Sequence, residues 1–468
     1  MRVPASFLTL AALCILLFTG QVASQKLVFA HYMVGTVTEE HARQDVDQAA
    51  AMGLDGFAMN IGDPTQPFVR DTMNYMFDYT RDKYPKFKLF FSLDLWASGG
   101  AGKKLADYDS LLRDFMGHGA YQKGPNGFPF ISTFDDGGTT KEVWLAWKKK
   151  WANKIYFVPD FDQTQGYYEA HPGWWGYWGD VVDGLFSWES SWPNVGQKNI
   201  GDISLDKKVA AGAAQRKKSY MIGLSMLQYK NAYGARLWRA GEDHLTQRMA
   251  AILTMTPSPN FTEILTWNDG PEAHYIGPLW PEQNTDRRPA AYASQASAPH
   301  TAIQPLLTAF IAAYKAGTPP SAMRPPALTP ARPAVGAIWY KPVHAGTACG
   351  GGDEYAARPL GLEAAREVVA WAVVVGSGSD VAGWRVQMWS GGVRVGAAVA
   401  LVPGLNSGVF EGLNVGAQRL EVVNKEGKVV MRAAGGRCVT KVCPDGIYNL
   451  NPQVVGLQMG ADYPGCRP

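Results

Sequence analysis

The 468-residue sequence lacks a marked excess of charge of either sign. It contains 44 Lys and Arg residues against 41 Asp and Glu residues, so its formal net charge is only +3, and no long run of one sign occurs. Proteins that bind nucleic acids or anionic membrane surfaces through charge concentrate basic residues on one face. We therefore expect no nucleic-acid and no membrane partner, and we expect a ligand that is itself neutral.

Several catalytic motifs are also absent. No HExxH segment occurs, the chain has only 8 His residues, and His31 lacks the second His of an HxH pair, so we expect no metal at the site. The absence of a GxSxG segment argues against a serine nucleophile on a strand-to-helix turn. A single glycine follows the first apolar run, which does not make the glycine-rich turn of a dinucleotide-binding fold, and we expect no cofactor.

Beyond the amino terminus, no apolar run approaches the length of a membrane span. Residues 1–24 combine Arg2, an apolar stretch centred on residues 8–18, and the small residues Ala23 and Ser24. This organisation predicts a secretory signal that is cleaved near Ser24, and hence a secreted, extracellular protein. An N-terminal membrane anchor is the alternative, but the stretch is short for a span.

Cysteines are few and unevenly placed. Cys14 lies within the predicted signal. The other four are confined to the last third of the chain: Cys349, Cys438, Cys443 and Cys466. An even number in a secreted chain predicts two disulfides, with the pairing left open. A zinc site is the alternative, but two close CxxC pairs are missing. A glycosylation sequon at Asn260 agrees with secretion.

Aromatic residues, in contrast, are abundant. They make up 12% of the chain and include 16 Trp and 20 Tyr residues. This exceeds what an ordinary core requires and leaves rings available for stacking. The C–H faces of sugars suit such rings, so the composition favours a carbohydrate ligand.

Eight short apolar runs alternate with amphipathic stretches of helical period. The runs begin at Lys26, Asp55, Lys88, Pro129, Lys154, Asp183, Ser219 and Thr262. The helical stretches are residues 39–53, 68–84, 141–152 and 242–255. Near-continuous apolar strands separated by helices indicate a parallel sheet covered on its outer face, and eight units are the number that closes a (β/α)8 barrel, here over residues 25–317. A doubly wound open sheet is the alternative.

The composition changes after a last predicted helix at residues 305–316. Residues 318–336 are rich in Pro and Ala and predict a linker or an extended strap. From residue 337 to residue 468, β-branched runs alternate with Gly, Asn and Asp turns, which is the pattern of a small antiparallel β-sandwich. This predicted accessory domain carries the four cysteines.

Polar and aromatic residues follow most of the predicted barrel strands, at the end where barrel enzymes place their catalytic groups. These residues are His31, Asn60, Asp94, Trp96, Asp160, Asp162, Trp188, Glu189, Trp192, Trp267, Asn268, Asp269, Glu272, His274 and Tyr275. A bowl lined with carboxylates and rings is what a glycosidase requires: one acid protonates the leaving oxygen, a second carboxylate activates water or attacks the anomeric carbon, and rings stack on sugars.

Within this set, we interpret Asp269 and Glu272 as the catalytic acids and the others as substrate-binding residues. The two acids lie three residues apart, so the charge of one can raise the pKa of the other and separate an acid from a base. In the alternative, they cap a helix or pair with Arg287 or Arg288. Glu189 is the rival catalytic residue, and its alternatives are a sugar contact or an ion pair.

Four segments carry a family resemblance. The segments “LVFAHYMVG” from Leu27, “GLDGFAMNIG” from Gly53, “DGLFSWESSWP” from Asp183 and “EILTWNDGPEAHYIGP” from Glu263 resemble the fungal α-1,3-glucanases, or mutanases, of glycoside hydrolase family 71. The resemblance covers essentially the whole mature chain. It implies a secreted endo-hydrolase that cleaves the α-1,3-glucan of fungal cell walls with inversion of configuration. Separately from the resemblance, we expect a monomer.

The resemblance also implies roles for single residues. The paired acids of its WND-x-x-E segment carry over onto Asp269 and Glu272, and we assign Glu272 as the acid and Asp269 as the base. One departure is Ala273, where a Ser is expected. An inverting pair stands about 6.5–9.5 Å apart, and a separation near about 5 Å would contradict inversion.

Two other functions remain open at this stage: a glycosidase for a different α-glucan, and a noncatalytic wall-glucan-binding protein. The C-terminal domain either binds glucan or braces the barrel.

Overall fold

The computed structural model describes residues 26–327, 332–350, 357–378, 381–443, 446–460 and 465–467. The predicted signal, residues 1–24, therefore lies outside the described residues. Within the described part of the chain, no helix combines the length and the apolarity needed to cross a membrane.

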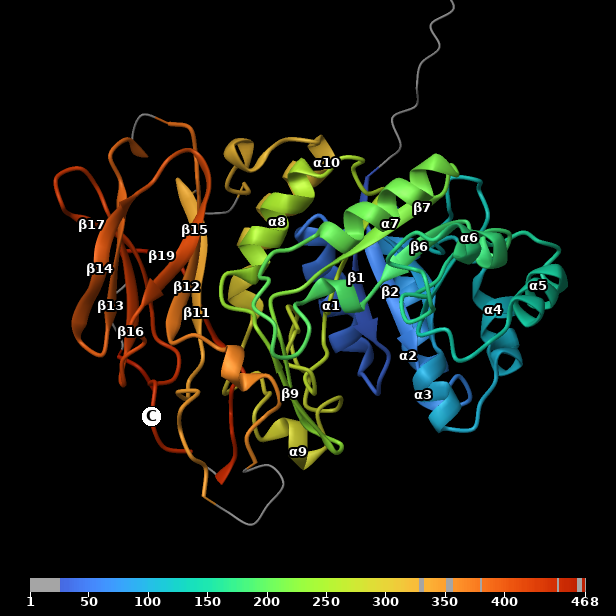
Figure 1. Ribbon diagram of the computed structural model, residues 1–468, viewed down its shortest axis with the longest axis horizontal. Coiled ribbons are helices and arrows are strands. Elements are labelled where there is room, and N and C mark those ends of the chain that lie inside the picture. The colour runs from blue at the N-terminus through green and yellow to red at the C-terminus, as the bar shows by residue number, and fades with distance from the viewer. Residues whose placement is uncertain are drawn as a thin grey trace, which may run out of the picture.

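Eight parallel strands form the first sheet, and their order confirms the predicted barrel (Figure 1). The strands are β1 (Leu27–Met33), β2 (Gly56–Ile61), β3 (Lys88–Asp94), β4 (Phe130–Phe134), β5 (Tyr156–Val158), β6 (Gly184–Ser187), β7 (Ser219–Leu224) and β10 (Phe261–Ile264). The order β5-β4-β3-β2-β1-β10-β7-β6 follows the chain around a circle. A parallel bridge between Asp160 and Phe186 joins the two outer strands. The sheet is therefore nearly closed, which excludes the open doubly wound alternative.

Helices cover the outside of this barrel, as the amphipathic segments predict. They are α1 (Glu39–Ala51), α2 (Pro67–Lys83), α3 (Leu95–Gly100), α4 (Asp109–Phe115), α5 (Lys141–Lys150), α6 (Pro172–Trp178), α7 (Ser204–Gln215), α8 (His244–Thr254), α9 (Arg287–Ala290) and α10 (Gln304–Ala316). Strands β2 and β7 are buried along their whole length because side chains on one face fill the barrel and those on the other meet helices.

An antiparallel hairpin, which the sequence analysis did not predict, follows β7. It consists of β8 (Gln228–Ala232) and β9 (Ala235–Arg239). Its two-residue turn is Tyr233–Gly234, and both residues have positive φ values, 56° and 77°. This is the backbone that a tight hairpin turn requires. The hairpin lies at the end of the barrel that carries α3 and α9 (Figure 1).

Two antiparallel sheets form the C-terminal region, as predicted (Figure 1). Their strands are β11 (Ala334–Tyr340), β12 (Val368–Val375), β13 (Arg385–Ser390), β14 (Val393–Ala400), β15 (Gly404–Glu411), β16 (Gln418–Val423), β17 (Val429–Ala434), β18 (Gln453–Gly456) and β19 (Gln458–Met459). One sheet has the order β15-β12-β11-β18 and the other β14-β13-β16-β17-β19. The predicted linker covers residues 318–336. Because β11 begins at Ala334, the last residues of this linker belong to a strand.

The first of these sheets is buried on both faces. In β12, Ala370, Ala372 and Val374 pack in one apolar core with the barrel, whereas the alternate residues, including Trp371 and Val373, pack against the second sheet. The period of two along a strand explains this division. It also explains why the run is apolar throughout, and it shows that barrel and sandwich share a core.

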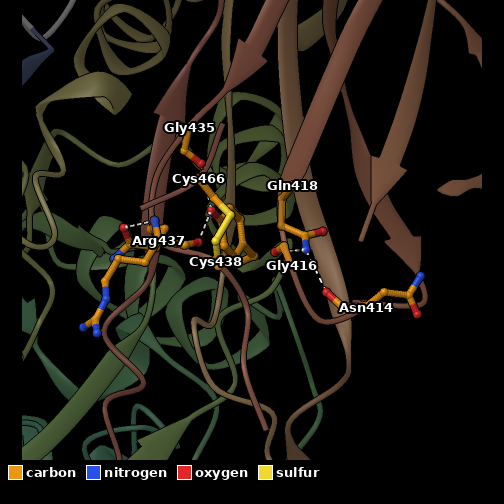
Figure 2. Close-up of a disulfide and its surroundings, with 9 residues drawn as sticks. Asn414, Gly416, Gln418, Gly435, Arg437, Cys438 and Cys466 are labelled. Carbon is orange, nitrogen blue, oxygen red and sulfur yellow. Dashed lines mark hydrogen bonds between the residues drawn. A yellow bond between two sulfur atoms is a disulfide. The ribbon is translucent and has the colours of Figure 1, made fainter. Parts of the chain in front are cut away.

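Two disulfides join the four cysteines of this region, which confirms their predicted number. Cys349 pairs with Cys443, and Cys438 pairs with Cys466. Figure 2 shows the second bond beside Gln418, whose amide donates to the carbonyl oxygens of Asn414 and Gly416. The pairing depends on which loops meet in space, and the sequence left it open.

Candidate active site

A cavity of about 530 Å³ opens at the C-terminal ends of the barrel strands. Its lining residues come from all around the barrel: His31, Met33, Asn60, Asp94, Trp96, Ala97, Phe134, Asp135, Asp160, Asp162, Gln163, Trp188, Glu189, Lys230, Tyr233, Asp269, Pro271 and Glu272. Both predicted acids and most of the predicted substrate-binding residues are among them. The cavity therefore gathers carboxylates from β3, β5, β6 and β10.

The two predicted acids lie on a compact loop that follows β10. The Asp269 amide donates to Thr266 Oγ1 at 2.9 Å, and the Glu272 amide donates to Asp269 Oδ1 at 2.9 Å. A Cβ on Gly277 would come within 2.3 Å of the Trp267 ring, so only glycine allows the loop to close at this point. The local sequence thus fixes both carboxyls on one wall of the cavity, which we call the β10 wall.

Ala273 is where this loop departs from the expected family pattern. It is buried and has a φ of 57°, in the left-handed region that non-glycine residues adopt at a cost. Its amide donates to the Gly270 oxygen at 3.0 Å, and the neighbouring His274 oxygen accepts from the Thr266 amide at 2.7 Å. Backbone bonds on both sides therefore close the loop with a methyl group in place of the expected Ser hydroxyl.

Glu272 is surrounded by hydrogen-bond donors, one of which is the Lys230 ammonium. Lys230 Nζ lies 3.0 Å from its Oε1, His274 Nε2 lies 3.1 Å from its Oε2, and the Gln228 amide also donates to Oε2. Burial acts to raise the pKa of Glu272, but the hydrogen bond from His274 and the charge of Lys230 outweigh it and hold the pKa well below its usual range. Glu272 is therefore the ionised member of the pair.

Asp269 is in the opposite state. Burial, and then the negative charge of Glu272, raise the pKa of Asp269, so this carboxyl keeps a proton to higher pH. The cation paired with Glu272 comes from the β8–β9 hairpin and not from Arg287 or Arg288, which the sequence offers nearby. The pair is thus divided into a proton holder and an anion, as expected, but in the reverse of the assigned order.

The spacing of the pair differs from the one expected for inversion. One carboxyl oxygen of Asp269 lies within 4.8 Å of one oxygen of Glu272. An inverting pair needs about 6.5–9.5 Å, to admit a water, whereas a retaining pair stands about 5–5.5 Å apart. In this structure the nearest oxygens of the two carboxyls therefore lie closer together than the two carboxyl groups of an inverting pair stand.

A second group of carboxyls lies after β5, on what we call the β5–β6 wall. Burial, and then the charge of Asp162, raise the pKa of Asp160. Burial also raises the pKa of Asp162 to about 6, although this carboxylate accepts hydrogen bonds from the Glu189 amide, Ser187 and Tyr168 at 2.8–2.9 Å. No cation is paired with Asp160 or Asp162 among the described residues.

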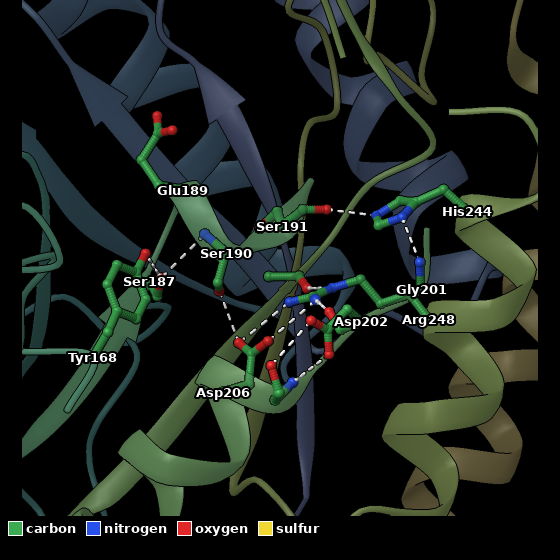
Figure 3. Close-up of polar contacts among 12 residues, drawn as sticks. Tyr168, Ser187, Glu189, Ser190, Ser191, Gly201, Asp202, Asp206, His244 and Arg248 are labelled. Atoms are coloured by element: carbon green, nitrogen blue, oxygen red, sulfur yellow. Dashed lines mark hydrogen bonds and ion pairs between the residues drawn. The ribbon is translucent and has the colours of Figure 1, made fainter. Parts of the chain in front are cut away.

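Glu189, the rival catalytic residue, belongs to the same wall. Its Oε2 lies 2.5 Å from Arg239 Nη2 on β9, so the predicted ion pair is present. Figure 3 shows its side chain directed away from the network beneath it, in which Ser190 donates to Asp206 and Arg248 pairs with Asp206 at 3.1 Å. This network anchors the turn at Glu189–Ser191 within the barrel.

Asp94 and Trp96 lie between the two walls, at the end of β3. Asp94 Oδ1 accepts from the Ala97 amide at 2.9 Å and caps α3, and burial raises its pKa. Trp96 is 68% exposed, which leaves its ring free to stack on a ligand at the rim. Asn60 is buried beside them at the end of β2 and bonds to the Asp94 carboxyl.

His31 lies at the floor of the cavity and is paired within the barrel. Its Nδ1 lies 2.6 Å from Glu263 Oε1, and both side chains are fully buried. Its ring meets Trp188 edge-on, with 4.8 Å between centroids. Glu263 is not predicted from the sequence, because an isolated carboxylate in an apolar strand gives no sign of its partner on a strand far away in the chain.

The remaining predicted residues are buried behind the cavity lining and support it: Trp192, Trp267, Asn268, His274 and Tyr275. Trp267 Nε1 donates to Asp45 at 2.9 Å. Asn268 bonds to both backbone groups of Met33, at 2.8 Å and 3.0 Å, and so ties the loop to β1. These contacts fix the position of the loop. In this structure, however, the side chains of these five residues do not line the cavity.

The β8–β9 hairpin supplies functional residues that the sequence analysis missed. Lys230 and Tyr233 line the cavity, and Arg239 holds Glu189. The alternating pattern around Tyr233–Gly234 is a signal that could have revealed the hairpin. It could not have shown that the hairpin reaches both walls.

The cluster of Asp269, Glu272 and His274 could in principle hold a metal ion, because their ligand atoms lie within 4.8 Å of one another. The Lys230 ammonium, 3.0 Å from Glu272, already occupies the position of a cation beside this carboxylate. The donor set therefore fits proton transfer better than metal binding.

Comparisons with known proteins identify the family of this chain. The profile described as “Glycosyl hydrolase family 71” matches residues 24–463. A mutanase from Penicillium rubens is 28% identical over 457 residues, covering 94% of this chain and 90% of that protein. A glucan endo-1,3-alpha-glucosidase from Schizosaccharomyces pombe is 28% identical over 321 residues, covering 63% of this chain and 67% of that protein. Among solved structures, the GH99 endo-alpha-mannosidase from Bacteroides thetaiotaomicron aligns with a TM-score of 0.46 and 9% identity, covering 62% of this chain and 98% of that chain. Because the profile matches nearly the whole chain, the protein belongs to glycosyl hydrolase family 71.

Proposed function

We propose that the protein is a secreted endo-hydrolase of the α-1,3-glucosidic bonds in fungal cell-wall α-1,3-glucan. The observation that carries this proposal is the divided pair on the β10 wall, where burial beside Glu272 raises the pKa of Asp269 while Lys230 and His274 lower the pKa of Glu272. Glycoside hydrolysis needs one group of each kind. Two relatives named for action on α-1,3-glucan support the choice of substrate.

We assign the roles from these electrostatics. Asp269 protonates the glycosidic oxygen of the leaving sugar, and Glu272 activates the water that attacks the anomeric carbon. This reverses the assignment made from the sequence. The reason is that Lys230 and His274 stabilise the anion of Glu272, whereas Asp269 is buried beside a negative charge.

Inversion of configuration is part of the proposal, and it makes a geometric demand. The Asp269 and Glu272 carboxyls, with oxygens within 4.8 Å of each other here, must separate to about 6.5–9.5 Å when a sugar and a water enter between them. If the pair stays close, the spacing fits retention instead.

Secretion and a monomeric state are proposed from the sequence. Two disulfides support an oxidising compartment. At the sequon, Asn260 Oδ1 accepts a hydrogen bond from the Tyr220 amide at 3.1 Å, at the beginning of β10. Amino-terminal sequencing and mass measurement of the protein recovered from culture medium would test cleavage near Ser24 and glycosylation at Asn260.

The test of function is a linkage screen. Purified protein is incubated with insoluble α-1,3-glucan and with an α-1,4-glucan, and released reducing ends are measured while ¹H NMR follows the first anomer formed. We expect cleavage of the α-1,3-glucan alone, with the β-anomer appearing first. Cleavage of only the α-1,4-glucan would assign a different substrate, and no cleavage would favour a noncatalytic binding protein. An α-anomer that appears first would overturn inversion.

A further inference from the structure

Residues 448–453 of the C-terminal domain, which we call the 448–453 segment, contact the elements around the acids of the active site. It runs into β18, and its residues Tyr448, Leu450 and Asn451 are buried against the barrel. Its contacts fall on the two elements that hold Glu272: the β8–β9 hairpin and the loop after β10.

The first contact is with the hairpin. The Tyr229 hydroxyl donates to the carbonyl oxygen of Tyr448, and Tyr229 is fully buried. The Tyr229 amide in turn donates to the carbonyl oxygen of Glu272 at 3.1 Å. The next residue is Lys230, whose ammonium pairs with the Glu272 carboxylate. The hairpin is thus held between the C-terminal domain and the catalytic loop.

The second contact is with the loop after β10. Asn451 Nδ2 donates to the Tyr275 hydroxyl and to the Tyr292 carbonyl oxygen, both at 2.9 Å. Tyr275 directly follows His274, which bonds to Glu272. The Tyr275 ring also stacks on His300, with centroids 4.0 Å apart. The ring, hydroxyl and backbone of Tyr275 are therefore all fixed.

A purely structural contact would not need this polar residue. Asn451 is fully buried, and burying an amide costs free energy unless its partners are well placed. Both partners that accept from its Nδ2 belong to the stretch that carries the catalytic loop and the chain after it. The polar bond specifies the position of that stretch in a way that an apolar contact would not.

We propose that the 448–453 segment positions Lys230 and His274 against the Glu272 carboxylate, so that the active site of the barrel is complete only with the C-terminal domain in place. This rests on the proposed function, in which Glu272 acts as an anion. Tyr229 and Asn451 are positioning residues. Tyr229 acts on Glu272 through Lys230, the next residue in the chain, and Asn451 acts through Tyr275, which follows His274.

The experiment uses the full chain and compares four variants. N451L and Y229F each remove one contact of the segment, and K230M removes the cation itself. W339F is the matched control, because Trp339 Nε1 makes a buried bond from the C-terminal domain to the Glu242 oxygen, at 2.5 Å, away from Glu272. For each variant, kcat/KM on soluble α-1,3-glucan oligosaccharides is measured from pH 2 to pH 8, together with Tm.

We expect the acidic limb of the pH profile to move to higher pH in N451L and Y229F, in the same direction as in K230M. A displacement of half a unit to one unit lowers kcat/KM about threefold to tenfold only at pH values below the pKa of Glu272, and little at neutral pH. W339F should lower Tm without moving the profile. If N451L does not fold, Y229F, which lacks a single oxygen, still provides the test.

The proposal is overturned if N451L and Y229F lower Tm but keep the wild-type profile, as the control does. A different failure is separable: if K230M itself leaves the profile unchanged, the anionic role of Glu272 is wrong, and with it the assignment on which this inference rests.

Discussion

The β10 wall and the β5–β6 wall of the cavity carry the same kind of residue in different surroundings. On the β10 wall, a hydrogen bond from His274 and the charge of Lys230 lower the pKa of Glu272, and burial beside this carboxylate raises the pKa of Asp269. On the β5–β6 wall, Asp160 and Asp162 are buried side by side, and both pKa values are raised. A carboxylate in a sugar-binding cavity is therefore not a catalytic group by virtue of its place alone. The neighbouring charges decide what it can do.

The largest effect expected from this comparison is loss of hydrolysis when the β10 wall is changed. D269N and E272Q should each lower kcat on α-1,3-glucan by about 10²–10⁴-fold, because each removes one proton-transfer step. The control on the other wall, E189Q, should lose less than about tenfold, since it removes a partly exposed ion pair. Release of reducing ends by folded variants measures both. Equal losses of kcat in D269N, E272Q and E189Q would contradict the proposed difference between the two walls.

The carboxyls of the β5–β6 wall should instead affect how the stability of the fold depends on pH. The folded-state pKa of Asp162 is raised to about 6, above its unfolded value of about 4. Its contribution to the free energy of unfolding is therefore present below pH 4 and is lost as the pH rises through 6. From this group alone the loss is up to about 3 kcal/mol. Denaturant unfolding of wild type and of D160N/D162N between pH 4 and pH 7 should show a flatter dependence in the variant. An equally steep dependence would contradict the raised pKa values.

The cation of the β10 wall should control its pH range. The charge of Lys230 lowers the pKa of Glu272, so K230M should raise that pKa and reduce the anionic fraction at acidic pH. At pH values below the pKa of Glu272, we expect kcat/KM to fall about tenfold for each unit of displacement, with little change at pH 7. K230R keeps the charge and serves as the control. The pH profile of kcat/KM is the measurement, and a uniform loss at all pH values would point to a binding role.

The smallest effect on activity is expected where the β8–β9 hairpin contacts the β5–β6 wall. R239M breaks the 2.5 Å contact with Glu189, a group that we do not place in the proton transfers. It should raise KM a few-fold, corresponding to about 1 kcal/mol, and leave the acidic limb in place. Steady-state kinetics of R239M and K230M would compare the effects of two residues of the same hairpin, Arg239 on β9 and Lys230 on β8. A displaced limb in R239M would mean that the walls are electrostatically linked.

Much of the fold could be predicted from local patterns. The apolar runs beginning at Lys26 and Asp55 became β1 and β2, because strands buried on both faces leave an uninterrupted apolar signature. The β8–β9 hairpin was missed because its strands are short and carry polar residues such as Lys230 and Asn231. The beginning of β11 was also missed, because Pro and Ala residues precede it without a break in composition.

The two acids of the site could be predicted from the sequence, but the direction of their pKa shifts could not. Asp269 and Glu272 stood out because acids and aromatic residues crowd after the last barrel strand. The direction of their pKa shifts depends on Lys230, 42 residues before Glu272 in the chain, and no local pattern connects the two. For the same reason Tyr275 resembled a substrate contact, although its hydroxyl is bound to Asn451 of the C-terminal domain.

The most direct test of the account is a leaving-group experiment on the β10 wall. An α-1,3-glucan oligosaccharide with an activated aryl group at its cleaved bond needs no general acid, so D269N should cleave it at a rate close to that of wild type, while E272Q should remain inactive on it as on glucan. That result would establish Asp269 as the acid and Glu272 as the anion that activates water. Recovery of E272Q with no recovery of D269N would reverse the two roles and contradict the electrostatic assignment.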